Sequence, residues 1–311
     1  MTTLEESTFL NLPCLRLHNA ALSLHITQSV GPRILALQLG DGPNLFAELP
    51  HFTIPCPGAG LLTLWGGHRL WHAPEVSRRT YLPDDQPVSI AAVPDGAHII
   101  QPTESAAGLQ KSLRVRLPDD SATVVVDHML TNHGLWPVTC APWAITQLRT
   151  GGTAVLPQLT SNADPDGLQP NRTLALWPYT DVNNPHIRWG NEVIRVTAAL
   201  TAGALKIGFP NPRGWLAYHW QKTLFVKRAH FDPQASYLDG NSSSQCYCND
   251  QFLELETLGP AATIAPGETM THREVWNVYG NVTLGETETA VARLIADLEL
   301  DTPHRDVKRE T

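Results

Sequence analysis

Short strand-like segments separated by turn residues constrain the fold of this chain more than any other feature. Its 25 prolines and 22 glycines divide 311 residues into brief pieces. Almost every piece is rich in Val, Ile, Leu, Thr or aromatic residues, which favour strands. Before residue 284, no segment has a convincing apolar period of 3.6 residues, as a helix would require. We therefore predict an all-β fold.

The clearest single element is a hairpin within residues 109–130. Leu113, Val115 and Leu117 alternate with polar or charged residues, and Pro118 to Ser121 supplies a turn. Because side chains of a strand point alternately to its two faces, this pattern predicts one buried and one wet face. Further strands are expected at residues 22–27, 33–39, 138–147, 174–177, 193–197, 205–208, 215–220, 224–228, 252–258 and 274–279.

Near the end of the chain, the strand-like pattern gives way to a helical one. From Glu286 onward, helical spacing places a set of apolar residues on one face. These residues are Ala290, Val291, Leu294, Ile295 and Leu298. We expect an amphipathic helix that covers an edge or face of a sheet, followed by a charged tail. With no fixed-period repeat and no flexible linker in the sequence, we predict one β domain over 1–283, with the helix and tail at 284–311.

Charge and cysteine content exclude several functional classes. A net charge of −8 and a pI near 5.9 argue against a nucleic-acid-binding surface. No apolar stretch approaches the roughly 20 residues that span a bilayer, and no export signal is recognisable, so we expect no membrane partner. Five scattered cysteines form no evident disulfide framework, which favours a cytoplasmic location. Cys246 and Cys248 are spaced too closely for a zinc knuckle, and we expect neither a metal nor a cofactor.

The segment "WGGHRLWHAPE", residues 65–75, is the first candidate for ligand binding. In an extended strand, His68 and His72 would share one face, and Arg69 and Trp71 the other. Aromatic rings stack on the apolar faces of sugars, while Arg and His side chains hydrogen-bond to hydroxyls. The segment suits a polyhydroxylated ligand, and a glycine-rich turn with half-buried aromatic residues explains it equally well.

The segment "LTNHGLW", residues 130–136, follows a run of β-branched residues. Counting by twos along an extended strand places His133 on the same face as Asp127. A histidine has an ordinary pKa near neutrality and can exchange protons at physiological pH. The alternative is a hydrogen-bonded histidine at a strand end, with no chemical role.

The segment "FLELETLGPAATIAPGETMTHREVW", residues 252–276, contains two carboxylates at a two-residue spacing. In a strand, Glu254 and Glu256 would share one face with Phe252. Neighbouring carboxylates raise each other's pKa, and partial burial raises it further, which can prepare a general base. The alternative is a solvated strand face whose glutamates pair with basic residues.

Taken together, these segments resemble the galactose-mutarotase-like superfamily, most closely a poorly characterised branch related to aldose 1-epimerases. The resemblance covers most of the chain, including "GPRILALQLGDGPNLF", "GGHRLWHAPE", "LTNHGLWPVTCAPWAIT", "LALWPYTD", "SYLDGN" and the segment at 252–276. It implies a β-supersandwich, in which two large antiparallel sheets are stacked and a sugar binds across an open concave sheet.

The resemblance also implies roles for individual residues. In mutarotases a strand bearing "LET", followed by "PGE", supplies the general base, which corresponds to Glu256. The "LTNH" element supplies the general acid, which corresponds to His133, although mutarotases usually continue with Ser or Thr, an aromatic residue and Asn. Together with the clusters above, it places the sugar against His68, Arg69, Trp71, His72, Asp239 and Glu254.

Acid–base catalysis at the anomeric carbon is the reaction that the resemblance implies. Glu256 would deprotonate the anomeric hydroxyl while His133 protonates the ring oxygen, so that the ring opens and closes again as the other anomer. Two alternatives stay open at this point. One is sugar binding without turnover, and the other is metal-dependent lyase or hydrolase chemistry at His68, His72 and Glu256. The identity of the sugar, its phosphorylation and the number of subunits are also open.

Overall fold

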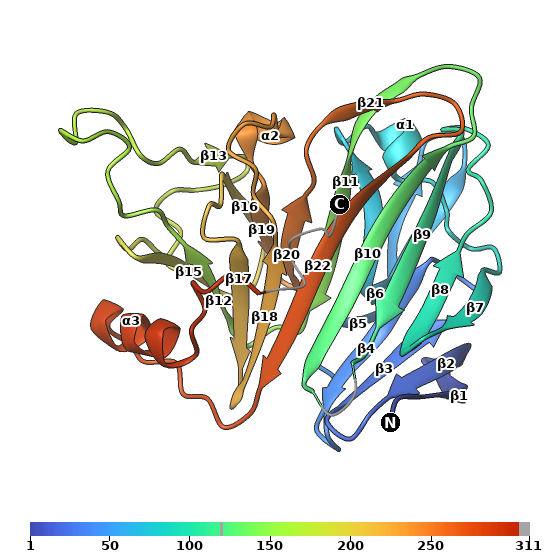
Figure 1. Ribbon diagram of the computed structural model, residues 1–311, viewed down its shortest axis with the longest axis horizontal. Helices are drawn as coiled ribbons and strands as arrows, with labels where there is room; N and C mark the ends of the chain where they lie inside the picture. Colours follow the sequence, from blue (N-terminus) through green and yellow to red (C-terminus); the bar gives the residue numbers. More distant parts are fainter. Residues whose placement is uncertain (119–120, 305–311) are drawn as a thin grey trace.

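Two large antiparallel sheets stacked face to face make up the protein, as Figure 1 shows for the computed structural model. The structure describes residues 1–118 and 121–304. The central residues of the expected turn at 118–121 and the end of the expected charged tail therefore lie outside the described residues. The all-β prediction and the expected stacking of two sheets are confirmed.

The larger sheet has twelve strands, ten of which follow one another across it. In spatial order they are β1 (Thr3–Phe9), β2 (Leu12–His18), β3 (Leu22–Thr27), β4 (Arg33–Leu39), β6 (Gly60–Ala73), β11 (Val138–Leu148), β20 (Leu253–Leu258), β19 (Ser244–Asn249), β16 (Ala204–Phe209) and β13 (Ala175–Leu176). In addition, β5 (Glu48–Cys56) pairs with β6, and β21 (Ala262–Ile264) pairs with β11.

The smaller sheet has ten strands. In spatial order they are β14 (Ile187–Arg188), β15 (Val193–Thr197), β12 (Thr153–Pro157), β17 (Trp215–Trp220), β18 (Thr223–Ala229), β22 (Thr269–Tyr279), β10 (Thr123–Asn132), β9 (Leu109–Arg116), β8 (Gly96–Ile100) and β7 (Ser89–Val93). Two single-turn helices, α1 (Ser77–Thr80) and α2 (Leu238–Asn241), lie in connections.

The main apolar core lies between the two sheets. Alternate residues of each strand enter it, so that Leu253 and Leu255 of β20 pack there together with Leu113 and Val115 of β9. Arg114, between the last two, is exposed, whereas Ser112 on the same face is buried, so the predicted wet face of the hairpin is present only in part. Because side chains alternate along a strand, Glu254 points away from this core, to the outer face of the larger sheet.

For residues 65–75 the sequence left open an extended strand and a glycine-rich turn, and the structure shows a strand, β6. In the structure both glycines lie within the strand, with φ of 87° and 74°. A Cβ atom added at Gly66 would lie 1.8 Å from the carbonyl oxygen of Ala47, and one at Gly67 would lie 2.1 Å from that of Ile34. The glycines therefore allow neighbouring backbone to approach the strand more closely than any side chain would permit.

The expected C-terminal helix is present as α3 (Glu288–Asp297), beginning two residues later than the sequence suggested. Its buried residues Val291 and Ile295 pack with Trp215 and Leu224. Since Leu216 and Phe225 enter the core between the sheets, the helix covers the outer face of the smaller sheet. Figure 1 shows it beside β12 and β15.

Thr287 caps this helix, since its side chain accepts a hydrogen bond from the backbone N–H of Ala290. Replacing Thr287 with alanine is expected to lower the free energy of unfolding by about 1 kcal/mol, because the N–H loses its acceptor. Chemical denaturation measures the change. Thr283→Ala, at an exposed site before the helix, is the control; equal stability of the two variants would show that the cap contributes nothing.

All five cysteines are free and buried. Within residues 1–118 and 121–304, no helix has the length and apolar character needed to cross a membrane.

Candidate functional site

A cavity of about 450 Å³ opens on the outer face of the larger sheet. Its volume falls in the range that small-molecule sites occupy. Residues from β5, β6, β11, β16, β19 and β20 contribute to its lining, together with loop residues. The aromatic residues that form most of its wall include Trp71, Tyr81, Trp143, Trp177, Tyr179 and Tyr247. A wall of this composition presents flat apolar faces edged by hydroxyl groups.

Lys206 places a positive charge in this aromatic wall. Its Nζ atom lies 4.7 Å from the ring centroid of Trp143 and 4.8 Å from that of Trp177. Both distances allow a cation–π interaction. Lys206 was not among the residues predicted from the sequence, although a single lysine between the buried residues Leu205 and Ile207 is unusual in a strand and could have revealed it.

Glu256 is fully buried just beneath this lysine. Its Oε2 atom accepts hydrogen bonds from Lys206 Nζ at 2.8 Å and from Trp143 Nε1 at 2.6 Å. Its Oε1 atom has no hydrogen-bond partner within the described part of the chain. These short contacts suit a carboxylate anion. Glu256 is therefore the counter-ion of Lys206, and it does not itself line the cavity.

Glu254, two residues earlier on the same face of β20, does line the cavity. Its Oε1 atom accepts a hydrogen bond of 2.9 Å from Gln147 Nε2. Burial, followed by the nearby charge of Glu256, raises the pKa of Glu254 to about 8, while Lys206 and Arg69 partly oppose the shift. This carboxyl group is therefore mostly protonated at neutral pH and ionises slightly above it.

Arg69 and Asp239, both expected to contact a sugar, adjoin this site without lining the cavity. Arg69 is almost fully buried, stacks at 5.1 Å over Trp71 and donates a hydrogen bond of 3.1 Å to Gln147 Oε1. Asp239 accepts a hydrogen bond of 2.8 Å from Gln245, which pairs with Glu256 across β19 and β20. Among the expected contacts, only Trp71 and Glu254 lie in the cavity wall.

His68 and His72 lie on the other side of the larger sheet, so the expectation that they contact a sugar there is wrong. They share the face of Leu70, which packs in the core between the sheets, and both are fully buried. His68 hydrogen-bonds to Thr146 at 2.9 Å and to His128 at 2.7 Å. A metal site that joins these histidines to Glu256 is excluded for the same reason, because Glu256 faces outward.

His133 is an exposed residue on the smaller sheet. Its ring lies 3.3 Å from Gln110 Oε1, and its backbone N–H donates to the carbonyl of Gly108. His133 comes directly after β10 and continues the series of outward-facing residues that includes Asp127, which pairs with Arg273. Val126 and Leu130, on the other side of β10, enter the core between the sheets. The predicted pairing of His133 with Glu256 is therefore wrong, because the two residues belong to opposite outer faces of the sandwich.

A buried polar network joins the two sheets. Lys227 Nζ lies 2.9 Å from Glu274 Oε1, and Trp276 Nε1 donates to the other oxygen of Glu274 at 2.8 Å. His68, His128 and Glu274 are close enough together to hold a metal ion. However, His128 Nδ1 lies 3.0 Å from the backbone carbonyl of His272, so the Nε2 atom of a neutral His128 is free to accept a hydrogen bond from His68. Hydrogen bonds and the Lys227 ammonium thus account for this cluster.

Comparison with known proteins identifies relatives by structure alone. No protein-family model matches the sequence, and no curated protein matches it either. A galactose mutarotase related enzyme from Lactobacillus acidophilus aligns over 92% of this chain and 100% of its own, with a TM-score of 0.54 and 7% identity. A galactose mutarotase-like protein from Lactobacillus casei aligns over 86% and 100%, with a TM-score of 0.53 and 9% identity.

A protein from Escherichia coli K12, provisionally named aldose 1-epimerase, aligns over 90% of this chain and 100% of its own. Its TM-score is 0.52 and its sequence identity is 12%. At such low identities the comparisons establish the fold and leave the chemistry to be argued from the site. Many of the structural neighbours are aldose 1-epimerase or galactose mutarotase-like proteins, and this chain has their galactose-mutarotase-like fold.

Proposed function

We propose that this protein binds a sugar in the aromatic cavity and catalyses acid–base chemistry at its anomeric carbon, as an aldose 1-epimerase-like enzyme. One observation carries the proposal: a proton acceptor, Glu254, and a proton donor, Lys206, both line the cavity. The names of several structural neighbours support the same reaction class.

In this mechanism Glu254, in its ionised form, removes the proton of the anomeric hydroxyl. The Lys206 ammonium protonates the ring oxygen, and the ring opens to the aldehyde. Rotation about the C1–C2 bond and closure with the reverse transfers give the other anomer, so no proton is gained or lost overall. Glu256 is a positioning residue, because its ion pair with Lys206 fixes the lysine Nζ atom between Trp143 and Trp177.

We assign the base role to Glu254 rather than to Glu256, the residue that the family resemblance indicates. Glu256 has no exposed surface, and the side chains of Lys206 and Trp143 cover its Oε2 atom. A general base must come within hydrogen-bond reach of the proton that it removes. Glu254 lines the cavity that we propose as the sugar site, and its pKa of about 8 is close to the working pH of a base.

The burial of Glu256 also favours a second candidate function, sugar binding without turnover. In that case the aromatic wall and Lys206 would form a binding platform alone. A panel of hexoses examined by NMR separates the two functions, because one measurement reports both binding and anomer exchange. We expect exchange above the spontaneous rate for at least one hexose, whereas binding without added exchange would establish the second function.

His133→Ala is expected to leave anomer exchange unchanged, because His133 lies on the outer face of the other sheet. Polarimetry on the variant and the unmodified protein, at equal concentration, measures this. A loss of tenfold or more would return the general-acid role to His133 and contradict the assignment to Lys206.

A further inference from the structure

Carboxylates outnumber cations around the cavity. Glu254 and the exposed residue Glu75 line it, with Glu256 beneath and Asp239 beside it. Lys206 is the single charged cation among the described lining residues, and its ammonium is already paired with Glu256. Of the two nearby buried arginines, Arg33 is bound to Asp84, and Arg69 donates a hydrogen bond to Gln147. Glu254 accepts one hydrogen bond, from the uncharged Gln147, and has no ion-pair partner among the described residues.

The aromatic wall suits a cation as well as a sugar ring. Trp and Tyr faces attract an ammonium group through their quadrupoles. Lys206 already demonstrates this geometry, with its ammonium between two indole rings and one carboxylate. Tyr247 and Trp71 line the cavity together with Glu254, so a second ammonium could have both aromatic and carboxylate contacts.

We propose that the preferred ligand of this cavity is an amino sugar whose ammonium group pairs with Glu254 against the aromatic wall. This inference rests on the proposed function, since it names the substrate class of the same site. A sugar phosphate or a uronic acid would bring a further anion among Glu75, Glu254 and Glu256, and like charges at close range oppose binding.

Proton release should accompany this binding. The cavity raises the pKa of Glu254 through burial and through Glu256, and a bound ammonium would lower that pKa again. The carboxyl group then loses its proton as the ligand binds. The same ion pair would convert Glu254 into an ionised base at neutral pH, so the amino group of the substrate would activate the residue that we assign to proton removal.

Isothermal titration calorimetry at mildly acidic pH, where the sugar amine is protonated, tests the inference. Each 2-amino-2-deoxyhexose is compared with its parent hexose and with its N-acetyl derivative, which has no charge. We expect the amine to bind about tenfold or more tightly than either, as a charge-assisted contact provides. Apparent enthalpies that differ between phosphate and Bis-Tris buffers, which both buffer at mildly acidic pH and differ in ionisation enthalpy, would reveal the proton release.

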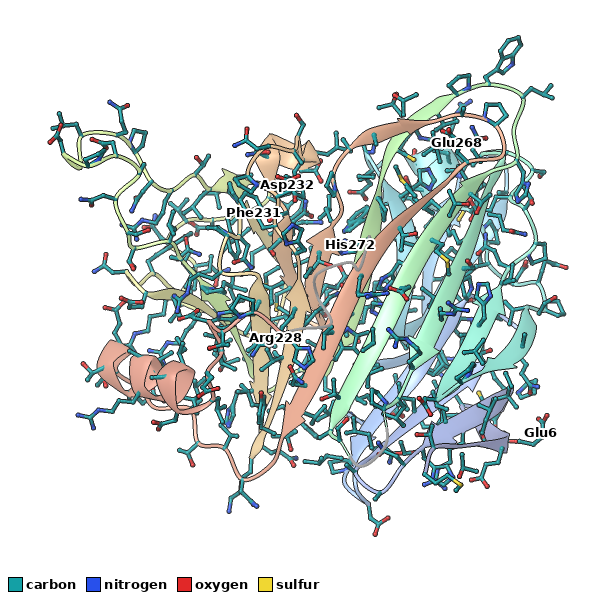
Figure 2. The ribbon with its side chains drawn as sticks, in the orientation of Figure 1. Glu6, Arg228, Phe231, Asp232, Glu268 and His272 are labelled. Atoms are coloured by element: carbon teal, nitrogen blue, oxygen red, sulfur yellow. The ribbon has the colours of Figure 1, made fainter. Side chains whose placement is uncertain are left out.

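Glu254→Gln should abolish both the preference for the amine and the buffer dependence. Glu6→Gln removes one carboxylate at a distant exposed position on β1 (Figure 2) and should change neither. Equal affinity of the unmodified protein for amino and parent hexoses would overturn this inference and leave the proposed function intact. If no hexose of any kind binds, the proposed function fails as well.

Discussion

Replacing Glu254 with glutamine is expected to lower kcat/KM for anomer exchange by about 100- to 10,000-fold, the usual contribution of a positioned proton-transfer group. Glutamine has nearly the same shape and keeps a carbonyl oxygen that can accept the hydrogen bond from Gln147. Binding of the sugar should therefore survive while proton removal does not. Polarimetric initial rates, with the spontaneous rate subtracted, give the ratio directly.

The pH dependence of the same rate identifies the ionising group. Glu254 acts as a base only when ionised, and its pKa is raised to about 8. In the unmodified protein, kcat/KM should rise about tenfold per pH unit below pH 8 and level off above it, because the ionised fraction follows this course. Glu254→Gln should lose this rise, whereas Glu6→Gln should keep it. An unchanged rate in Glu254→Gln would remove Glu254 from the mechanism.

Replacing Lys227 with methionine is expected to lower the free energy of unfolding by about 3–5 kcal/mol. Lys227 and Glu274 are fully buried between the sheets, with 2.9 Å separating their charged atoms. Although burial alone raises the pKa of Glu274, Lys227 and the nearby histidines lower it below its ordinary value. Methionine fills a similar volume but leaves the Glu274 carboxylate without its cation in a site that water does not reach.

Urea denaturation at neutral pH measures this loss. Lys222→Met, at an exposed position beside β18, is the matched control and should change the free energy of unfolding by less than about 0.5 kcal/mol. Adding Glu274→Gln to Lys227→Met should recover part of the stability, because the uncompensated charge is then gone. A loss below about 1 kcal/mol in Lys227→Met would show that the ion pair between Lys227 and Glu274 contributes little to stability.

Alternation along strands made the faces of individual residues predictable. It separated Arg69 and Trp71 from His68 and His72, and the structure keeps this division. It also placed Glu254 and Glu256 on the same face of one strand. Alternation cannot say which face of a strand becomes the core, and two histidines looked more suited to a polar surface than to the space between two sheets.

Other parts of the site depend on contacts between distant segments. Lys206 reaches Glu256 because β16 and β20 both pair with β19 in the larger sheet. Trp177 joins them from the connection that follows β13. No spacing within a single segment encodes these neighbours. The prediction that His133 acts together with Glu256 failed for a related reason, because the sequence could not assign β10 and β20 to different sheets.

A crystal structure of the protein with a bound hexose or amino sugar tests the location of the ligand most directly. We predict a sugar ring on the outer face of the larger sheet, within hydrogen-bond distance of Glu254 and Lys206 and in contact with the indole of Trp143 or Trp177. A sugar bound only elsewhere, such as beside His133 on the smaller sheet, would contradict it.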